Sequence, residues 1–247
     1  MVLCHHAVSR TWPAALSVTP ERLEQQLESL VRRGYRGCTF SEALSQPPGP
    51  RTLVVTFDDA YRSVLTLGLP ILDRLGLPGT VFVPTAFAGH DQPMAWPGID
   101  EWVGGPHERE LLPLRWEELR SLHDSGWEIG SHTATHPRLP ELDHAALGSE
   151  LRGSKAACEE RLGVPCRSIA YPYGDVDARV AQAAKKAGYE CGAALPSRFH
   201  TPRPLEWPRV GVYHADTPLR FRLKASRLAR GWRSSAAGER IIRHVRL

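Results

Sequence analysis

Two adjacent carboxylates end an apolar run in the sequence LVVTFDDAY, residues 53–61. Asp58 and Asp59 would repel each other if both were ionised in an apolar neighbourhood, so the pair is typical of a site that holds a cation or a shared proton. If the run is a strand of an α/β barrel, both side chains follow its carboxyl end, where such barrels carry their active sites. The competing interpretation is that Asp59 caps the next helix while Asp58 faces water. The two aspartates alone favour neither interpretation.

Two histidines four residues apart follow another strand-like run in the sequence IGSHTATHP, residues 129–137. On a helical turn, His132 and His136 would lie on one face, close enough for both imidazoles to reach one ion. The spacing by itself is more often incidental. Two histidines and one carboxylate, however, form a common open zinc site that leaves room for a water molecule. The shared position at strand ends therefore favours a metal site over loop decoration.

A third strand-like run enters a Pro-Tyr-Gly turn in the sequence SIAYPYGD, residues 168–175. A tight turn with glycine exposes backbone N–H groups, and these can stabilise a developing oxyanion. An ordinary turn is the simpler interpretation of this segment taken alone.

The elements that must position these residues alternate between short apolar runs and helical patterns, which indicates β/α units around a mainly parallel sheet. The expected strands are Val2–His5, Gly37–Phe40, Leu53–Phe57, Thr80–Pro84, Glu128–Ser131, Ser168–Tyr171, Glu190–Leu195 and Val210–Tyr213. The expected helices are one that begins at Pro20 after the cap Thr19 and stops at Gly34, and those at Val64–Leu75, Trp116–Ser125, His144–Leu162 and Asp177–Ala187. Eight short strands of this kind fit a barrel.

A long insertion after the fourth expected strand carries two tryptophans, Trp96 and Trp102. Long loops are usually functional, and exposed aromatic rings can stack on sugars. The alternative, that both rings cover the end of the core, is equally compatible with the sequence.

The length of 247 residues suits a single α/β barrel, and the net charge of +4 is too mild to require a nucleic-acid partner. Basic residues concentrate near the end, so we divide the chain into a barrel domain over residues 1–215 and a basic, helical tail over residues 216–247. A solvated tail is the simpler interpretation, and peripheral contact with an anionic membrane surface is the alternative.

The five cysteines form no CxxC pair, which indicates free thiols in a reducing compartment. The sequence shows neither a leader pattern nor an apolar run of about eighteen residues. We therefore expect a cytoplasmic protein without a transmembrane segment.

The segments TFDD, SHTATH and YPYG, in this order, resemble the first three motifs of the polysaccharide deacetylases, a family with the NodB-type homology domain of carbohydrate esterase family 4. The start, VLCHHAV, resembles the YHxV segment of the exopolysaccharide N-deacetylase branch, with His6 at the histidine position and His5 in place of tyrosine. The resemblance extends from Val2 to about Tyr213. It implies a single-domain, distorted (β/α)7 barrel.

By position, the resemblance makes Asp58 the general base. Asp59, His132 and His136 become the ligands of a divalent metal, which we expect to be Zn²⁺, with Ni²⁺ or Co²⁺ also compatible. The backbone N–H of Tyr173 would stabilise the oxyanion. The chemistry is sound because a metal lowers the pKa of bound water, the attacking nucleophile, while Asp58 removes its proton.

Two departures from the family pattern concern the acid and an arginine. The usual late Leu-x-His motif is not recognisable, so we assign the proton donor to His6, with His214 as the second choice and surface exposure as its simpler interpretation. Ala170 stands where many members carry an arginine that orients the base. Arg209 could supply the same charge from another segment, or it could be a surface arginine at a strand start.

The resemblance therefore implies an enzyme that hydrolyses the N-acetyl group of an N-acetylated amino sugar or glycan precursor, releasing acetate and a free amine. One alternative is a hydrolase of small amides or cyclic ureides, similar to allantoinase. Another is a catalytically weak member that binds glycans.

Overall fold

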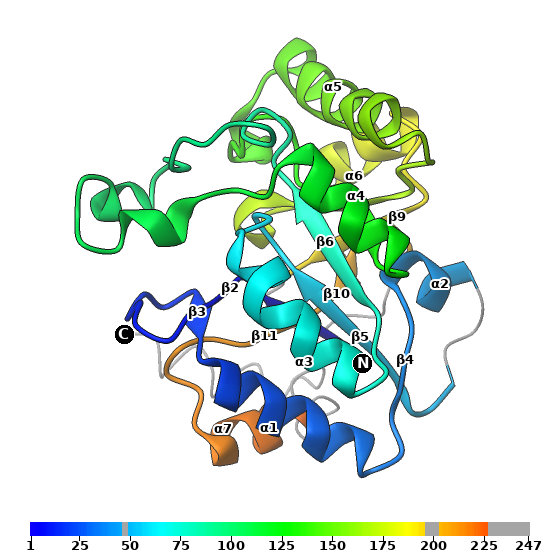
Figure 1. The fold of residues 1–247 in the computed structure, drawn as a ribbon. Coiled ribbons are helices and arrows are strands. Elements are labelled where there is room, and N and C mark those ends of the chain that lie inside the picture. Colours follow the sequence, from blue (N-terminus) through cyan, green and yellow to red (C-terminus); the bar gives the residue numbers. More distant parts are fainter. Residues whose placement is uncertain (46–48, 196–202, 227–247) are drawn as a thin grey trace, which may run out of the picture.

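A computed structural model describes residues 1–45, 49–195 and 203–226 of the chain. Its centre is a parallel sheet with the strand path β10-β9-β8-β7-β6-β5-β1-β11 (Figure 1). In chain order these strands are β1 (Val2–His5), β5 (Thr52–Phe57), β6 (Gly79–Val83), β7 (Glu128–Ser131), β8 (Ser168–Ala170), β9 (Cys191–Ala194), β10 (Trp207–Pro208) and β11 (Val210–Gly211). The short strand β4 (Arg36–Gly37) pairs with β5. The expected single-domain α/β barrel is confirmed.

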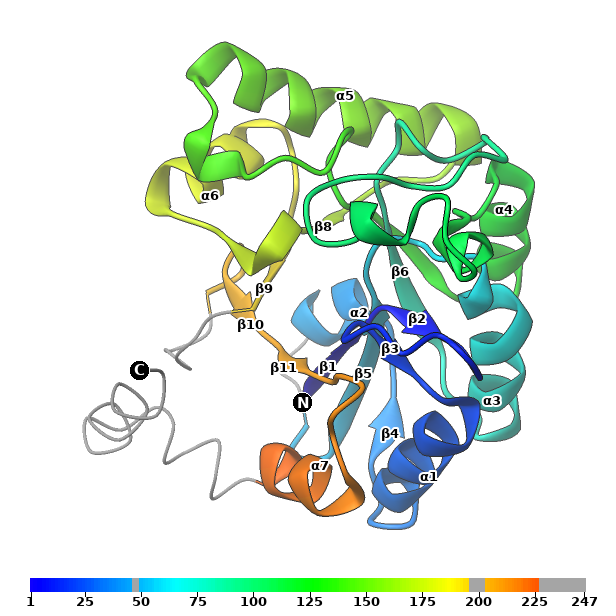
Figure 2. The same ribbon diagram turned by 90° about the vertical axis from the view of Figure 1, so that its left-hand side faces the viewer.

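One residue separates the two edge strands of the sheet. Strand β10 pairs with β9, β11 pairs with β1, and only Arg209 lies between β10 and β11. The Arg209 backbone N–H donates to the carbonyl of Ala194 at 3.1 Å, and the Val212 N–H donates to that of Cys4 at 2.8 Å. This segment therefore crosses from one edge to the other and nearly closes the barrel (Figure 2).

Alternate side chains of β5 face opposite sides of the sheet, as the pleat requires. Leu53, Val55 and Phe57 belong to the apolar layer beneath the outer helices. Val54 belongs to a separate cluster with Phe82 on the barrel's inner side. Continued by one step, this alternation directs the side chain that follows Phe57 into the barrel.

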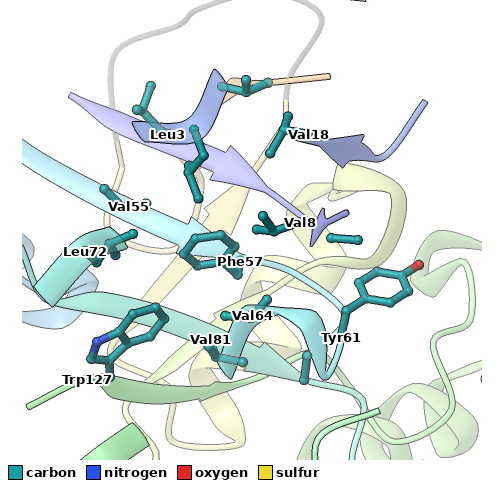
Figure 3. Close-up of a cluster of buried hydrophobic side chains, with 14 of the residues drawn as sticks. Leu3, Val8, Val18, Val55, Phe57, Tyr61, Val64, Leu72, Val81 and Trp127 are labelled. Carbon is teal, nitrogen blue, oxygen red and sulfur yellow. The ribbon is translucent and has the colours of Figure 1, made fainter. Parts of the chain in front are cut away.

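The outer layer is closely packed (Figure 3). The ring of Trp127 stacks on Phe57 with 5.6 Å between centroids and 18° between planes. It also covers Gly79, where a Cβ atom would lie 2.4 Å from the indole ring. Glycine is required there because any side chain would displace the tryptophan from the core.

The described residues contain seven α-helices. They are α1 (Pro20–Val31), α2 (Phe40–Ser45), α3 (Leu69–Arg74), α4 (Trp116–Asp124), α5 (His144–Leu162), α6 (Ala178–Lys186) and α7 (Pro218–Ala225). All except α2 lie on the outside of the sheet (Figures 1 and 2). The expected start of α1 is confirmed, since the Thr19 side chain accepts from the Arg22 N–H at 3.3 Å. None of these helices is long and apolar enough to cross a bilayer.

Several boundaries differ from the predictions. The strand expected at Gly37–Phe40 is present only as β4, Arg36–Gly37. Its predicted end is wrong, because Phe40 begins α2 and the Glu42 carboxylate accepts the Thr39 N–H at 2.9 Å as a helix cap does. The helix expected at Val64–Leu75 begins as a π-helical turn, Val64–Gly68, and becomes α-helical only at Leu69.

Some short strands were not predicted from the hydrophobic pattern of the sequence. The strand expected at Val210–Tyr213 ends at Gly211, and β10 was missed because a two-residue strand containing proline has almost no pattern of its own. A small parallel pair, β2 (Ala7–Val8) with β3 (Ser17–Val18), was missed for the same reason of length. Within the tail expected over residues 216–247, α7 follows the cap Thr217 and buries Phe221 in the main core. Residues 227–247 of that prediction lie outside the described residues.

Candidate active site

The adjacent aspartates point to different partners because the backbone turns sharply between them. Asp58 extends β5 by one step, with its N–H donating to the His5 carbonyl at 2.9 Å. Asp59 and Ala60 then adopt left-handed conformations, with φ of 67° and 52°. Such conformations are costly for residues other than glycine and are concentrated at functional sites. The turn separates the two carboxylates and thereby relieves their repulsion.

Asp59 meets both histidines of the SHTATH segment. Its Oδ1 lies 3.3 Å from Nε2 of His132 and 3.3 Å from Nε2 of His136. All three side chains are at most 5% exposed. The proximity expected from the strand ends is therefore present in the structure.

The orientation of each imidazole leaves Nε2 directed at this site. His132 Nδ1 lies 2.8 Å from the Ala170 carbonyl, so Nδ1 carries the hydrogen and the Nε2 lone pair is free. The ring of Trp96 stacks on His136 at 4.2 Å and fixes its plane. His136 itself has a φ of 61°, which lets the chain turn back after Thr133.

The three side chains fit a divalent metal. One carboxylate oxygen and two imidazole nitrogens, all within 4.8 Å of one another, converge on one point. This is the nitrogen and oxygen donor set of an open zinc site, and the hydrogen bond from His132 to Ala170 is the outer contact that such ligands usually make. The same donors accept Ni²⁺ and Co²⁺.

Asp58 is held by Arg209 instead. The guanidinium donates to Oδ1 at 2.6 Å and to Oδ2 at 2.7 Å, and its side chain is fully buried. Burial acts to raise the pKa of Asp58, but the Arg209 charge and its hydrogen bonds prevail and lower it to about 2. Asp58 is therefore an ionised carboxylate with both oxygens oriented. Arg209 is a buried partner of Asp58, and the interpretation as a surface arginine is wrong.

Two further residues of this network were not expected from the sequence. Thr56 accepts from Arg209 at 2.9 Å and donates to the Leu3 carbonyl at 2.8 Å, which anchors the guanidinium to β1. The Cys4 thiol lies 3.4 Å from Asp58 Oδ2. Burial raises the pKa of Cys4 well above its usual value, so it remains a neutral donor. The period-two alternation of β1 was the only sequence signal that placed Cys4 inside the barrel.

His6 lies at the same end of the barrel as the aspartates. Its ring is 9% exposed, and one ring nitrogen lies within 4.8 Å of an Asp58 oxygen. Burial lowers the pKa of His6, although the Asp59 and Asp58 charges oppose the shift. His5 faces the other way and packs on Phe57 at 5.5 Å, as the pleat predicts.

His214, the second choice for the acid, is bound elsewhere. Its N–H donates to the Ala15 carbonyl at 2.9 Å and its carbonyl accepts from Arg22 at 2.6 Å. These backbone contacts anchor the segment after β11 to the loop between β2 and β3 and to Arg22 of α1. The geometry therefore favours His6 for the acid, which stays a prediction.

Tyr173, in the turn Pro172–Gly174, flanks His136 of the candidate metal site. Its φ of 60° is left-handed, and its ring contacts His136 at 4.8 Å between centroids. The next residue must be glycine, because a Cβ on Gly174 would lie 2.4 Å from the Leu195 side chain. The turn is therefore tightly specified, while the proposed role of the Tyr173 N–H stays a prediction.

The long insertion covers the site rather than extending away from it. Its end is bound to the left-handed turn at Asp59 and Ala60, since the Leu114 N–H donates to the Ala60 carbonyl at 2.8 Å. Trp96 is only 7% exposed between His136 and Phe87, so its ring packs against His136 and is not available to stack on a sugar. Trp102 is half-buried and packs edge-on against Trp12 at 5.8 Å.

The family model for polysaccharide deacetylase matches residues 45–192, which contain all three motifs. The chain belongs to the polysaccharide deacetylase family. It is 26% identical over 196 residues to the protein YxkH of Bacillus subtilis, covering 77% of this chain and 62% of that protein. The chain thus spans less than two thirds of that relative's length.

Two other similarities connect the family to the observed fold. The chain is 24% identical over 209 residues to poly-β-1,6-N-acetyl-D-glucosamine N-deacetylase of Staphylococcus aureus, covering 78% of this chain and 67% of the relative. A polysaccharide deacetylase from Bacillus cereus superposes with a TM-score of 0.72 at 27% identity, covering 91% of this chain and 68% of that chain. This member of the polysaccharide deacetylases therefore shares its barrel with a solved structure of the family.

Proposed function

We propose that this polysaccharide deacetylase is a metal-dependent hydrolase that removes N-acetyl groups from an amino-sugar glycan. The observation that carries the proposal is that the two adjacent carboxylates have different partners. Asp58 is held ionised by Arg209 at 2.6 and 2.7 Å, while Asp59 faces His132 and His136 at 3.3 Å. Asp58 is therefore not one of the three proposed metal ligands and is available as a base.

The substrate class is inferred from the family and from the named relative. The Staphylococcus aureus relative is a poly-β-1,6-N-acetyl-D-glucosamine N-deacetylase. We infer that this chain acts on N-acetylglucosamine in a glycan or glycan precursor and needs no nucleic acid. The expected cytoplasmic location stays a prediction.

A divalent metal, when bound by Asp59, His132 and His136, would polarise the acetamide carbonyl and lower the pKa of a coordinated water. Zn²⁺ is the first metal to test. The protein's own residues then carry the proton transfers. Asp58 accepts the proton of the attacking water, because the buried Arg209 keeps it ionised and fixes its orientation.

Water adds to the carbonyl carbon, and negative charge develops on the carbonyl oxygen. The N–H of Tyr173 would donate to that oxygen, and the tight turn that holds the Tyr173 ring against His136 supports this assignment. The C–N bond then breaks as His6, in its protonated form, gives a proton to the departing nitrogen. The proton that Asp58 took from the water then restores His6. The products are acetate and the free amine of the sugar.

The test is acetate release from β-1,6-linked N-acetylglucosamine oligomers by protein that has been stripped of metal and then given Zn²⁺, Ni²⁺ or Co²⁺. We expect chelation to abolish turnover and one of these ions to restore it. Turnover that survives complete metal removal would contradict the mechanism. Activity only on allantoin or simple amides would identify a small-amide hydrolase, and glycan binding without acetate release under any metal would identify a binding protein.

A further inference from the structure

Helix α7 is apolar on two opposite faces. Phe221 and Ala225, four residues apart, are buried in the main core at 2% and 1% exposure. Leu219 and Leu223, also four residues apart, are 65% and 57% exposed. At 100° per residue the two pairs point in opposite directions. One face holds α7 on the barrel, and the other projects two leucines into solvent.

This second face is unusual in the molecule. Among the described residues, the exposed large apolar side chains are Val103 and these two leucines. Scattered single apolar residues on a surface need no explanation, but an i, i+4 pair on one helix forms a continuous apolar stripe. The stripe also borders a hollow of about 760 Å³ between α7 and the end of α1.

Cations frame the leucine stripe. Arg220 and Arg222 lie on its two sides along the helix, and Arg33 from the end of α1 lines the same hollow. Within the described part of the chain, no carboxylate forms an ion pair with Arg33 or Arg222, whereas the neighbouring Arg32 is paired with Glu28 at 2.6 Å. The surface therefore combines exposed leucine with uncompensated positive charge.

The sequence continues this character after α7. The basic residues that follow are Arg227, Arg230, Arg233, Arg240, Arg243 and Arg246, with Glu239 as the single acid between them. Apolar side chains flanked by arginine are typical of segments that lie in the interface of an anionic bilayer, where leucine enters the acyl boundary and arginine meets phosphate.

We propose that the surface of Leu219, Leu223, Arg222 and Arg33 docks this protein on an anionic lipid membrane. A second copy of the chain fits the surface less well, because a twofold contact through the leucines would bring the arginines of both copies together. Nucleic acid fits less well because phosphate contacts would leave the leucines in water. The inference is independent of the deacetylase proposal, since its evidence lies on α7 and α1.

The experiment is sedimentation of the full-length protein with vesicles of equal parts phosphatidylcholine and phosphatidylglycerol, compared with pure phosphatidylcholine vesicles. We expect binding to the anionic vesicles that weakens at high salt. The double variant Leu219→Ser/Leu223→Ser should bind ~10-fold or more weakly. The variant Val103→Ser is the matched control. It removes an apolar side chain that is 43% exposed but does not belong to the proposed docking surface. It should bind as the parent does.

The variant Arg33→Gln/Arg222→Gln tests the charges, and should weaken binding to anionic vesicles while leaving the thermal unfolding temperature unchanged. Failure of the parent protein to bind anionic vesicles would overturn the proposal. Equal binding by the parent and the leucine variant would also overturn it, because the attachment would then lie elsewhere. Concentration-dependent dimerisation that the leucine variant loses would assign the surface to a second copy instead.

Discussion

Arg209 and Asp58, separated by 151 residues in the sequence, form a fully buried, two-point ion pair. The guanidinium fork matches the carboxylate geometry, and Thr56 holds the fork from the other side. Members of the family with an arginine before the Pro-Tyr turn would bring a cation from β8, where this chain has Ala170. Here the cation comes from the segment that closes the barrel.

Replacing Arg209 should impair both folding and activity. Arg209→Gln leaves a buried carboxylate without its partner, so we expect the free energy of unfolding to fall by about 3–5 kcal/mol. Arg209→Lys keeps the charge but loses the two-point contact, so it should recover part of the stability and little of the turnover. Denaturant unfolding and acetate release measure the two effects. The control is Arg203→Gln, since Arg203 is 71% exposed in its pair with Glu206 and should be close to neutral.

The ion pair of Arg209 and Asp58 should also determine how stability and activity depend on pH. Arg209 lowers the pKa of Asp58 to about 2 against the opposing effect of burial. The stabilisation is therefore complete above the ordinary carboxyl pKa and is lost as the pH falls towards 2. Arg209→Lys keeps a positive charge but loses the two hydrogen bonds that help to oppose burial, so the pKa of Asp58 should rise. The acidic limb of kcat/KM should then move to higher pH in an Arg209→Lys protein that remains folded. An acidic limb unchanged from the parent would show that Asp58 is not the group that titrates.

Asp58 and Asp59 should differ in their effect on metal binding. Asp59→Asn removes the charged ligand, and we expect bound zinc, measured by elemental analysis, to fall together with activity. Asp58→Asn removes the base but touches no ligand, so it should retain zinc while turnover falls by ~10²–10⁴-fold. Equal loss of zinc in both variants would mean that Asp58 also coordinates the ion.

His6 should matter most when the leaving group needs a proton. We expect His6→Gln to lower kcat on N-acetylglucosamine oligomers by ~10²–10⁴-fold. An acetate ester of nitrophenol releases a stable anion, so the same variant should hydrolyse it nearly as well as the parent does. His214→Gln serves as the control and should leave both reactions unchanged. Equal loss on both substrates would argue against a role for His6 as the acid.

Gly79 offers a test of the packing beneath the site. A methyl group there would lie 2.4 Å from the Trp127 ring, so Gly79→Ala should destabilise the protein by about 1–3 kcal/mol. Gly153 in α5 has no atom within 4 Å of the corresponding position. Gly153→Ala should therefore be neutral or stabilise the protein by up to about 1 kcal/mol through helix propensity. Thermal or denaturant unfolding of the two variants gives the comparison.

Local features of the chain were predictable from the sequence. Thr19 and Pro20 start α1, and the helix His144–Leu162 has the predicted bounds, because caps and apolar periodicity depend on neighbouring residues. The ends of β5 and β7 were also predictable, and they place Asp59, His132 and His136 at one end of the sheet once the strands are parallel. The turns that follow were not predicted: the spacing of His132 and His136 suggested a helical turn, but Thr133 and His136 have left-handed φ of 67° and 61°.

The rest depended on tertiary structure. Arg209 finds Asp58 only because β10 and β11 close the barrel around it, and no local pattern marks a two-residue strand. Trp96 reaches His136 only because the insertion folds back over the site. By itself, therefore, the sequence determined which residues stand at strand ends and which chemistry they suit. The tertiary structure decided which cation orients the base. The contact between Arg209 and Asp58 joins segments 151 residues apart, and local periodicity cannot predict a contact over that separation.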